Sequence, residues 1–317
     1  GVSNIGISAK TDGVHSGLIE LSSGNINVTA SSLNDGDIPL GIYASGNNIT
    51  VSSTSTSNVT VSPNAVGIYI DGDDTSKTSG NMNISLSSDT SGKMGIGAYY
   101  KGGSFADNGT MTLTSTGTAI SGTSPVRPIG LYYGTGSAQN KADIEIAGGS
   151  AEIIGMYGSN LSTFTNDGNI TLYSKGIGAY FLNSDVINHG DIMINAMDGY
   201  GIYFKGGNSS SDGIITAGEP NSVGAIVSGT GSILSNDGSI NATGASSIGT
   251  YVENGAVFTN NGTLNATISG STGSIGAFTK GATIENTGNI NSNYLGLYGK
   301  DGSTINQTSG IVTVNDG

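Results

Sequence analysis

The feature that most constrains this chain is a short phrase that it repeats along its length: a glycine between apolar residues, followed by an aromatic residue. Gly-Ile-Gly-Ala-Tyr-Phe at 176–181 returns with changes at 199–204, 247–252 and 274–279. Aligning the copies gives a column of anchor glycines: Gly6, Gly41, Gly67, Gly97, Gly130, Gly155, Gly178, Gly201, Gly224, Gly249, Gly276 and Gly296. From Gly41 onward their spacing is 20 to 33 residues. A period of this size predicts a solenoid, in which each repeat buries its apolar face against its neighbours.

The side-chain pattern around the anchor glycines indicates strands. The residues just before and just after each glycine, such as Ile177 and Ala179, are nearly all apolar. Residues two apart in a strand share a face, so we expect both columns to face the core, and the glycine and the residue two beyond it to face outward. Parallel strands lie about 4.8 Å apart, so this outward column predicts an external aromatic ladder. Its tyrosines are Tyr43, Tyr69, Tyr99, Tyr132, Tyr157, Tyr180, Tyr203, Tyr251 and Tyr298.

A second phrase, Asn-x-Gly, falls between the anchors, as at 166–168, 188–190 and 286–288. Asn and Gly both tolerate positive φ, which indicates a turn, and short apolar strands flank it. Stacked asparagines at this turn would form an internal amide ladder. Helical periodicity is not evident. The sequence therefore predicts one all-β domain over 1–317, a right-handed parallel β-helix (β-solenoid) of about 12 coils with about three short strands in each.

The repeats differ in the length of their insertions. The longest fall at 29–39, 71–79 and 115–128, so residues 1–129 form a loop-bearing part and residues 130–317 a more regular part. Insertions in solenoids emerge as loops that often carry binding. On position alone, the expected ligand contacts are Asp35, Asp37, Asp73, Asp74 and Arg127. The sequence begins and ends within a repeat. Because solenoids need capping repeats, we expect a fragment of a longer coil.

Metal and cofactor chemistry finds little support in the residues. The acids at 71, 73 and 74 could offer oxygen ligands to Ca²⁺, but the full EF-hand pattern and the glycine-rich calcium nonapeptide are both missing, and Asp with Gly is ordinary turn chemistry. The absence of cysteine excludes disulfides and thiolate metal sites. We predict no metal site and no cofactor.

Catalysis is equally poorly supported. Lyases built on β-helices need clustered Arg or Lys, and hydrolases of this kind need paired carboxylates. The chain has a single arginine, Arg127, and scattered lysines. Of its two histidines, His15 and His189, the second fills the variable middle of an Asn-x-Gly turn. We therefore predict that the chain is not an enzyme.

The net charge of −13 makes nucleic acid and anionic membranes poor partners. Its simplest role is to keep a solenoid with open strand edges soluble and monomeric. No apolar run approaches about 18 residues, so we expect no membrane insertion by this segment. The exposed aromatic ladder offers a surface on which sugar rings or peptide side chains can stack, although rings over cross-strand glycines also stabilise a sheet without any ligand.

The alternation of Gly-Ile-Gly-Ala-Tyr-Phe with Asn-x-Gly-x-Ile, at about 23 residues and without cysteine, resembles the passenger regions of very large autotransporter adhesins of fusobacteria and their relatives. The resemblance covers nearly all of 41–317 and implies an extracellular passenger anchored at the bacterial outer membrane. It also implies attachment to host cells or other bacteria through surface glycans or proteins. No binding motif of the family maps onto individual positions here. Two alternatives stay open: a polysaccharide-binding or polysaccharide-cleaving β-helix of the tailspike or lyase type, and a ligand-free stalk.

Overall fold

The computed structural model describes residues 5–12, 15–22, 24–29, 38–73, 75–88, 93–105, 109–117, 127–149, 152–267 and 273–315. The described residues form strands and turns, with no helix among them. The chain divides into two compact units, Gly1–Ser162 and Thr163–Gly317. Each is a β-solenoid of three parallel sheets, here called A, B and C, and the units together hold about ten turns. The all-β solenoid predicted from the repeat is confirmed. The prediction of one domain over 1–317 stays a prediction.

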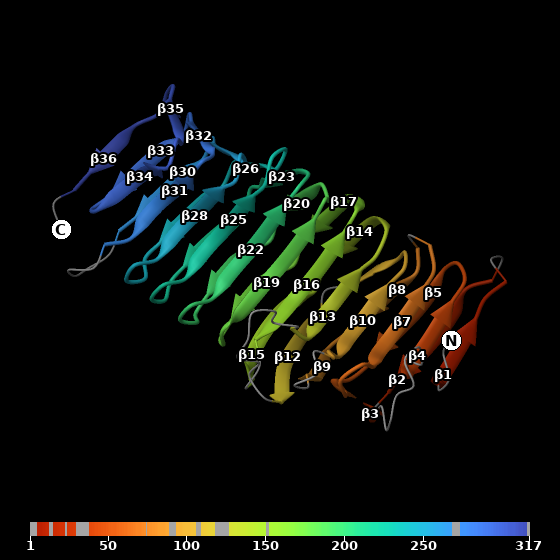
Figure 1. Ribbon diagram of the computed structural model, residues 1–317. Helices are drawn as coiled ribbons and strands as arrows, with labels where there is room; N and C mark the ends of the chain where they lie inside the picture. The colour runs from red at the N-terminus through yellow and green to blue at the C-terminus, as the bar shows by residue number, and fades with distance from the viewer. Residues whose placement is uncertain are drawn as a thin grey trace. The chain divides into compact units, whose positions relative to one another are not determined.

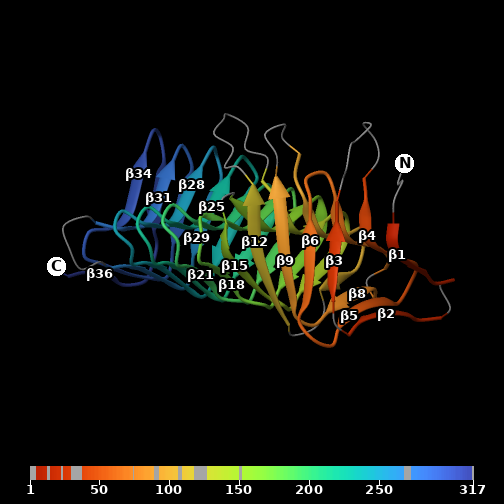
Figure 2. The same cartoon turned by 90° about the horizontal axis from the view of Figure 1, so that it is seen from below.

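In the first unit, each coil contributes one strand to each sheet (Figure 1). Sheet A contains β1 (Ile5–Lys10), β4 (Leu40–Ser45), β7 (Val66–Asp71), β10 (Ile96–Tyr100), β13 (Ile129–Tyr133) and β16 (Ile153–Ser159). Sheet B contains β2 (Gly17–Leu21), β5 (Ile49–Ser53), β8 (Lys77–Ser79), β11 (Ser104–Phe105) and β14 (Gly136–Asn140). Sheet C contains β3 (Asn25–Val28), β6 (Ser57–Val61), β9 (Met82–Ser88), β12 (Thr110–Gly117) and β15 (Asp143–Gly149), which lie side by side in Figure 2.

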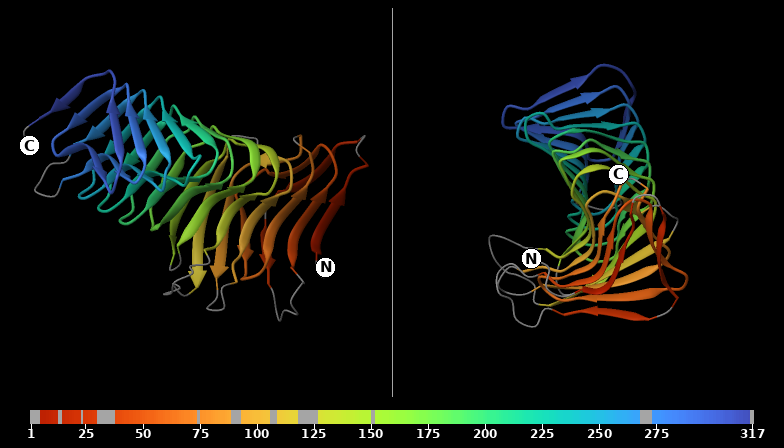
Figure 3. Two further views of the ribbon diagram at one scale, coloured as in Figure 1. Left: turned by 45° about the horizontal axis from the view of Figure 1, so that its top comes forward. Right: turned by 90° about the vertical axis from the view of Figure 1, so that its right-hand side faces the viewer.

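The second unit repeats this order, and Figure 3 shows its strands stacking coil on coil. Its sheet A contains β19 (Gly176–Leu182), β22 (Tyr200–Lys205), β25 (Val223–Ser228), β28 (Ile248–Glu253), β31 (Ile275–Lys280) and β34 (Leu295–Lys300). Sheet B runs from β17 (Leu161–Asn166) through β20 (Val186–Asn188), β23 (Asn208–Ser211), β26 (Ile233–Asn236), β29 (Val257–Asn260) and β32 (Thr283–Asn286) to β35 (Thr304–Gln307). Sheet C contains β18 (Ile170–Leu172), β21 (Ile192–Ile194), β24 (Ile214–Ala217), β27 (Ser239–Ala242), β30 (Thr263–Ala266), β33 (Asn289–Ser292) and β36 (Val312–Val314).

The core of each unit lies between its three sheets. Alternate residues of each strand point into it, so Ile192 and Ile194 are buried while Met193 between them is 46% exposed. In sheet A the residue after the anchor glycine is buried from Ile42 to Ala277, as Ile42 and Ile68 show at 0% exposure. This confirms the prediction that the residue after the anchor glycine faces the core.

The anchor glycines from Gly41 to Gly276 are buried, which corrects the prediction that they face outward. A Cβ atom on Gly67 would lie 2.5 Å from the carbonyl oxygen of Gly97 and 2.8 Å from Cγ1 of the core residue Val59. The same overlap, with the next glycine's carbonyl and with a sheet C side chain, recurs at Gly224. Glycine is therefore required because the backbones of successive coils touch here.

The residues just before the anchor glycines, called the pre-glycine residues, also depart from simple alternation. The register of β7 and β10 pairs Val66 with Ile96 and resumes at Ile68 with Ala98, past the two glycines. The register is the same on both sides of the glycines, so the departure is a local change of side-chain direction. A Cβ on Gly67 would point at the core residue Val59, and Ile68 beside it is also buried, so two consecutive positions face the core.

Three pre-glycine residues, Leu40, Val66 and Ile96, border a hollow on the tyrosine side of sheet A, although Leu40 and Val66 are only 4% and 5% exposed. The prediction for this column is therefore confirmed in part: Leu40, Val66, Ile129, Ile177 and Val223 are buried, but Leu40, Val66 and Ile96 also line a surface hollow.

The Asn-x-Gly phrase builds the predicted internal amide ladder, in the second unit. Asn166 donates to Oδ1 of Asn188 at 2.8 Å, and Asn188 donates to Oγ of Ser211 at 3.0 Å. The reason for the glycine differs from the expected positive φ, because Gly190 does not have one. A Cβ on Gly190 would instead overlap the carbonyl oxygen of Gly168 in the coil before it.

Candidate functional site

Five tyrosines on the outer side of sheet A in the first unit stack in one continuous ladder. Tyr43 and Tyr69 have ring centroids 5.7 Å apart, and Tyr69 and Tyr99 have centroids 4.9 Å apart with planes only 2° from parallel. Tyr132 follows Tyr99 at 4.7 Å, and Tyr157 follows Tyr132 at 5.0 Å. The ladder predicted from the repeat is confirmed here as geometry, while its role in binding stays a prediction.

The backbone register positions these rings. Tyr43 pairs with Tyr69 and Tyr69 with Tyr99 on adjacent parallel strands, so each ring lies beside its counterpart in the next coil. Aromatic rings in contact are separated by about 3.5–4 Å, so centroids 4.7–4.9 Å apart require the rings to be offset along their planes. The rings cover much of one another's faces and present their edges to the side of the ladder.

A groove runs beside the first three rings. It is bordered by the ladder and by the pre-glycine residues, and its volume is about 400 Å³. Its lining residues are Ile38, Leu40, Tyr43, Val66, Tyr69, Asp71, Ile96 and Tyr99. A concave, mainly apolar hollow of this size with a few polar groups is the usual form of a small-ligand site. We take this aromatic groove as the candidate functional site.

The polar groups of the aromatic groove are one carboxylate and the tyrosine hydroxyls. Asp71 lies 3.3 Å from Nζ of Lys101, and both side chains are partly exposed. Burial raises the pKa of Tyr69 to about 12, assisted by the charge of Asp71 and by the neighbouring Tyr99 and Tyr43. Tyr69 is therefore a neutral phenol at physiological pH, and Asp71 is the charged group among the groove's lining residues.

The second unit has shorter runs of stacked rings. Tyr180 and Tyr203 stack at 4.8 Å. The next residue in the column is Ile226, which pairs with both Tyr203 and Tyr251 in the strand register and separates their rings. Beyond it, Tyr251 stacks on Phe278 at 5.1 Å, and a tilted contact with Tyr298 follows at 5.4 Å.

The acids predicted as ligand contacts are not brought together into a site among the described residues. Asp35, Asp37 and Asp74 lie outside the described residues. Asp73 is described, and its Oδ1 accepts hydrogen bonds from the backbone N–H groups of Asn48 and Thr75 and from the hydroxyls of Thr75 and Ser76. Burial alone would raise its pKa, but these hydrogen bonds outweigh burial and lower the pKa. Asp73 thus holds its own loop together.

Arg127 is likewise engaged inside the fold. Its Nε lies 2.8 Å from Oε2 of Glu152, and its NH2 group lies 2.5 Å from the same oxygen. Both side chains are about three-quarters covered. Arg127 precedes β13 and Glu152 precedes β16, so the pair links two consecutive coils where they enter sheet A. Arg127 enters the coil next to the last coil of the aromatic groove, since Ile129 pairs with Ile96, but it is not among the groove's lining residues.

The described residues contain no cluster of three or more acidic, histidine or cysteine residues that could hold a metal ion. They also contain no long apolar helix of the kind that crosses a membrane. His189 contacts Asp212 in the neighbouring coil at 2.9 Å, both largely exposed, as expected of residues in stacked turns.

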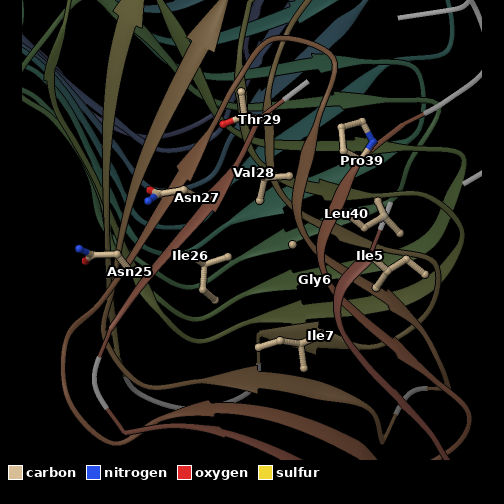
Figure 4. A pocket seen from close by; sticks show the side chains of 11 residues that line it. Ile5, Gly6, Ile7, Asn25, Ile26, Asn27, Val28, Thr29, Pro39 and Leu40 are labelled. Atoms are coloured by element: carbon tan, nitrogen blue, oxygen red, sulfur yellow. The ribbon is translucent and has the colours of Figure 1, made fainter. Parts of the chain in front are cut away.

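A second hollow, of about 570 Å³, lies at the first coil (Figure 4). Its apolar lining comes from β1, β3 and β4, and Ile26 and Val28 point into it while Asn25 and Asn27 point away. The equivalents of Ile26 and Val28 in the next coil are Val59 and Val61, which are fully buried. The hollow is therefore the uncovered end of the core among the described residues, and it has no chemistry of its own.

Reasoning from the sequence missed most of the aromatic groove. It identified Tyr43, Tyr69 and Tyr99 but placed Leu40, Val66 and Ile96 in the core. The available signal was the anchor glycine, because a glycine in a strand often marks a bulge or a close backbone approach. Comparison of the chain with protein-family models, with curated proteins and with solved structures finds no match.

Proposed function

We propose that this chain is a segment of a bacterial cell-surface adhesin, a right-handed β-helix of about 12 coils that attaches the cell to host cells or to other bacteria. The observation that carries the proposal is the aromatic groove. It is a concave, apolar surface on a molecule whose net charge is −13 and whose interior is filled by its own side chains. Recognition on such a scaffold takes place on the outside of the coils.

The proposed partner is a glycan or protein of another cell's surface, contacted by a monomeric segment exposed at the outer surface of the bacterium. Stacked coils suit this role because each coil is held by parallel strands on both sides, which keeps exposed side chains in fixed positions relative to one another. Tyr43, Tyr69 and Tyr99 are held in this way by their strand register. Exposed apolar patches on otherwise polar proteins commonly mark interaction sites.

The ligand-free stalk is the second candidate. Its support is that stacked rings stabilise neighbouring strands without any ligand, as cross-strand aromatic pairs do. The cleaving alternative needs a second carboxylate across the groove from Asp71. Among the lining residues, Asp71 is the one acid, so the groove gives this alternative no support.

The test is binding of the labelled, folded chain to a glycan array and to bacterial and epithelial cells. Tyr69→Ile alters the groove, and Tyr203→Ile is a matched control in a stacked pair of the second unit. Isoleucine is compatible with this column because Ile226 occupies it naturally. We expect saturable binding that Tyr69→Ile weakens about tenfold or more and Tyr203→Ile leaves unchanged. Absence of binding by the folded chain would support the stalk, and equal binding by all three proteins would place recognition outside the groove.

A further inference from the structure

The aromatic groove has a direction. Its pre-glycine residues Leu40, Val66 and Ile96 come from β4, β7 and β10, and its tyrosines come from the same three strands. These strands are successive neighbours in sheet A, so the groove runs across them in the direction in which the coils stack. With neighbouring strands about 4.8 Å apart, it extends for about 10 Å between the outer two. A ligand that fills it is elongated and lies along the stack.

The two sides of the groove favour a flat, apolar ligand. One side is aliphatic, formed by Leu40, Val66 and Ile96, and the other is the row of tyrosine rings. The rings stack along the groove, so their edges face it. Ring edges are electropositive and pack well against the face of an uncharged aromatic ring, in the edge-to-face arrangement. The uncharged part of a planar aromatic ligand can therefore pack against the ring edges on one side, and against Ile96 and the small accessible parts of Leu40 and Val66 on the other.

A sugar fits the aromatic groove poorly, so of the two partners proposed for adhesion this groove favours a protein. Sugars stack on the face of an aromatic ring, and the faces of Tyr69 are occupied by Tyr43 on one side and Tyr99 on the other. A sugar in the groove would also place hydroxyls against Leu40 and Val66, where they would lack hydrogen-bond partners, and such burial is unfavourable.

The carboxylate of Asp71 favours a ligand that carries a positive charge. Asp71 is the acid that lines the groove, while Tyr69 beside it is neutral at physiological pH. The ion pair between Asp71 and Lys101 is partly exposed, with the Lys101 side chain 54% accessible, and pairs of this kind are weak. A ligand cation can therefore replace Lys101 beside Asp71. The net charge of −13 also favours approach of a cation.

We propose that the aromatic groove is a binding site for an elongated, planar aromatic cation, held along the coil stack with its positive charge near Asp71. It concerns the same groove as the adhesin proposal but does not rest on that proposal, since binding of a small molecule needs no cell-surface receptor. Its ligand class is small, in keeping with a volume of about 400 Å³.

The probe is thioflavin T, a planar benzothiazolium cation whose fluorescence rises when it is held rigidly, titrated into the monomeric chain after size-exclusion chromatography. A neutral benzothiazole analogue of similar length serves as the uncharged probe. The variants are Tyr69→Ile and Asp71→Asn in the groove and Tyr203→Ile as the matched control. Circular dichroism and melting curves establish that each variant is folded.

The expected result is a saturable fluorescence increase with one site per chain. Tyr69→Ile weakens thioflavin T binding about tenfold, which corresponds to about 1.4 kcal/mol, and Tyr203→Ile leaves it unchanged. Asp71→Asn weakens binding of the cation several-fold and leaves binding of the neutral analogue unchanged. The proposal is overturned if wild-type protein shows no saturable signal, or if Tyr203→Ile weakens binding as much as Tyr69→Ile. It is also overturned if Asp71→Asn affects both probes equally. Dye binding without cell binding would contradict the adhesin proposal alone. Cell binding without dye binding would contradict the aromatic-cation proposal alone.

Discussion

The side-chain amide of Asn260 donates a hydrogen bond to Oδ1 of Asn286 in the next coil over 2.6 Å. Asn260 also accepts one from Asn236 in the preceding coil at 2.7 Å, and it is fully buried. Three consecutive coils of the second unit are thus joined by side chains within the core, in addition to their backbone ladders.

Asn260→Ala should destabilise the protein by about 2–4 kcal/mol, because it leaves the Asn236 donor and the Asn286 acceptor buried without this partner. The matched control is Asn265→Ala. Asn265 bonds to Asn241 and Asn291 in the same head-to-tail manner, at 2.7 and 2.9 Å, but it is only half-buried, so water can replace it. Urea unfolding followed by circular dichroism compares the two variants. Equal losses would show that burial of the ladder contributes nothing.

Gly224→Ala tests the requirement for glycine at the anchor. A Cβ there would lie 2.6 Å from the carbonyl oxygen of Gly249 and 2.9 Å from Cγ2 of Ile215, so the coils must move apart. Overpacking of this kind costs about 1–3 kcal/mol. The control is Gly218→Ala, where the nearest atom is the carbonyl oxygen of Ile194 at 3.3 Å. A lowered melting temperature for Gly224→Ala alone is expected, and a neutral effect would contradict the close approach.

Ile226→Tyr should join the two ring stacks of the second unit. Ile226 pairs with Tyr203 on one side and Tyr251 on the other, so a tyrosine at this position acquires two stacking partners. Aromatic pairs contribute about 0.5–1.5 kcal/mol each beyond their area, which predicts a gain of about 1–3 kcal/mol. Ile226→Leu, which adds no ring, should change little. Chemical denaturation measures both, and a destabilised Ile226→Tyr protein would count against in-register stacking as the cause.

High pH should weaken the first unit through Tyr69, whose pKa is raised from 10.0 to about 12 in the fold. A raised pKa means that the folded state holds the phenol proton more tightly than the unfolded state does. The resulting stability is fully present below pH 10 and is lost as the pH rises towards 12. In a spectrophotometric titration, Tyr69→Ile should remove an ionisation step near pH 12.

Asp71→Asn is the companion variant for this titration. Its charge is the second cause of the shift, after burial, so its removal should lower the pKa of Tyr69 without returning it fully to 10.0. An unchanged titration curve in Tyr69→Ile would contradict the assignment of this step to Tyr69.

The parts of the fold that follow from simple alternation could be predicted from the sequence. The aromatic ladder and the amide ladder both arise because a solenoid superimposes equivalent residues of successive repeats. The buried pair Tyr100 and Tyr133, stacked at 4.9 Å, follows the same rule, since both lie three residues beyond an anchor glycine, on the inward side. This buried stack could therefore have been predicted from the sequence, although the sequence analysis did not predict it.

The aromatic groove could not be predicted in the same way. Its pre-glycine residues line it because strict alternation of side chains fails at the anchor glycine, where Gly67 and Ile68 both face the core. This failure appears only in the three-dimensional structure. The position of Asp71 beside Tyr69 could have been anticipated, because residues two apart in a strand share a face. The hydrogen bonds of Asp73 within its own loop depend on local turn geometry, which the repeat does not encode.

The glycine-to-carbonyl contact between coils also sets the unit by which a chain of this kind can lengthen or shorten. A segment inserted between two coils restores the glycine-to-carbonyl contact only if it contains its own anchor glycine. It must also bring the backbone back to the same position in sheet A. Duplication or deletion from one anchor glycine to the next meets this condition, whereas a fraction of a coil does not. The residues on both sides of the anchor glycine stay paired in sheet A when the spacing is 33 residues, from Gly97 to Gly130, and when it is 20, from Gly276 to Gly296. Residues can thus be inserted or deleted in the turns between anchor glycines, whereas the number of coils changes only by duplication or deletion of a whole coil.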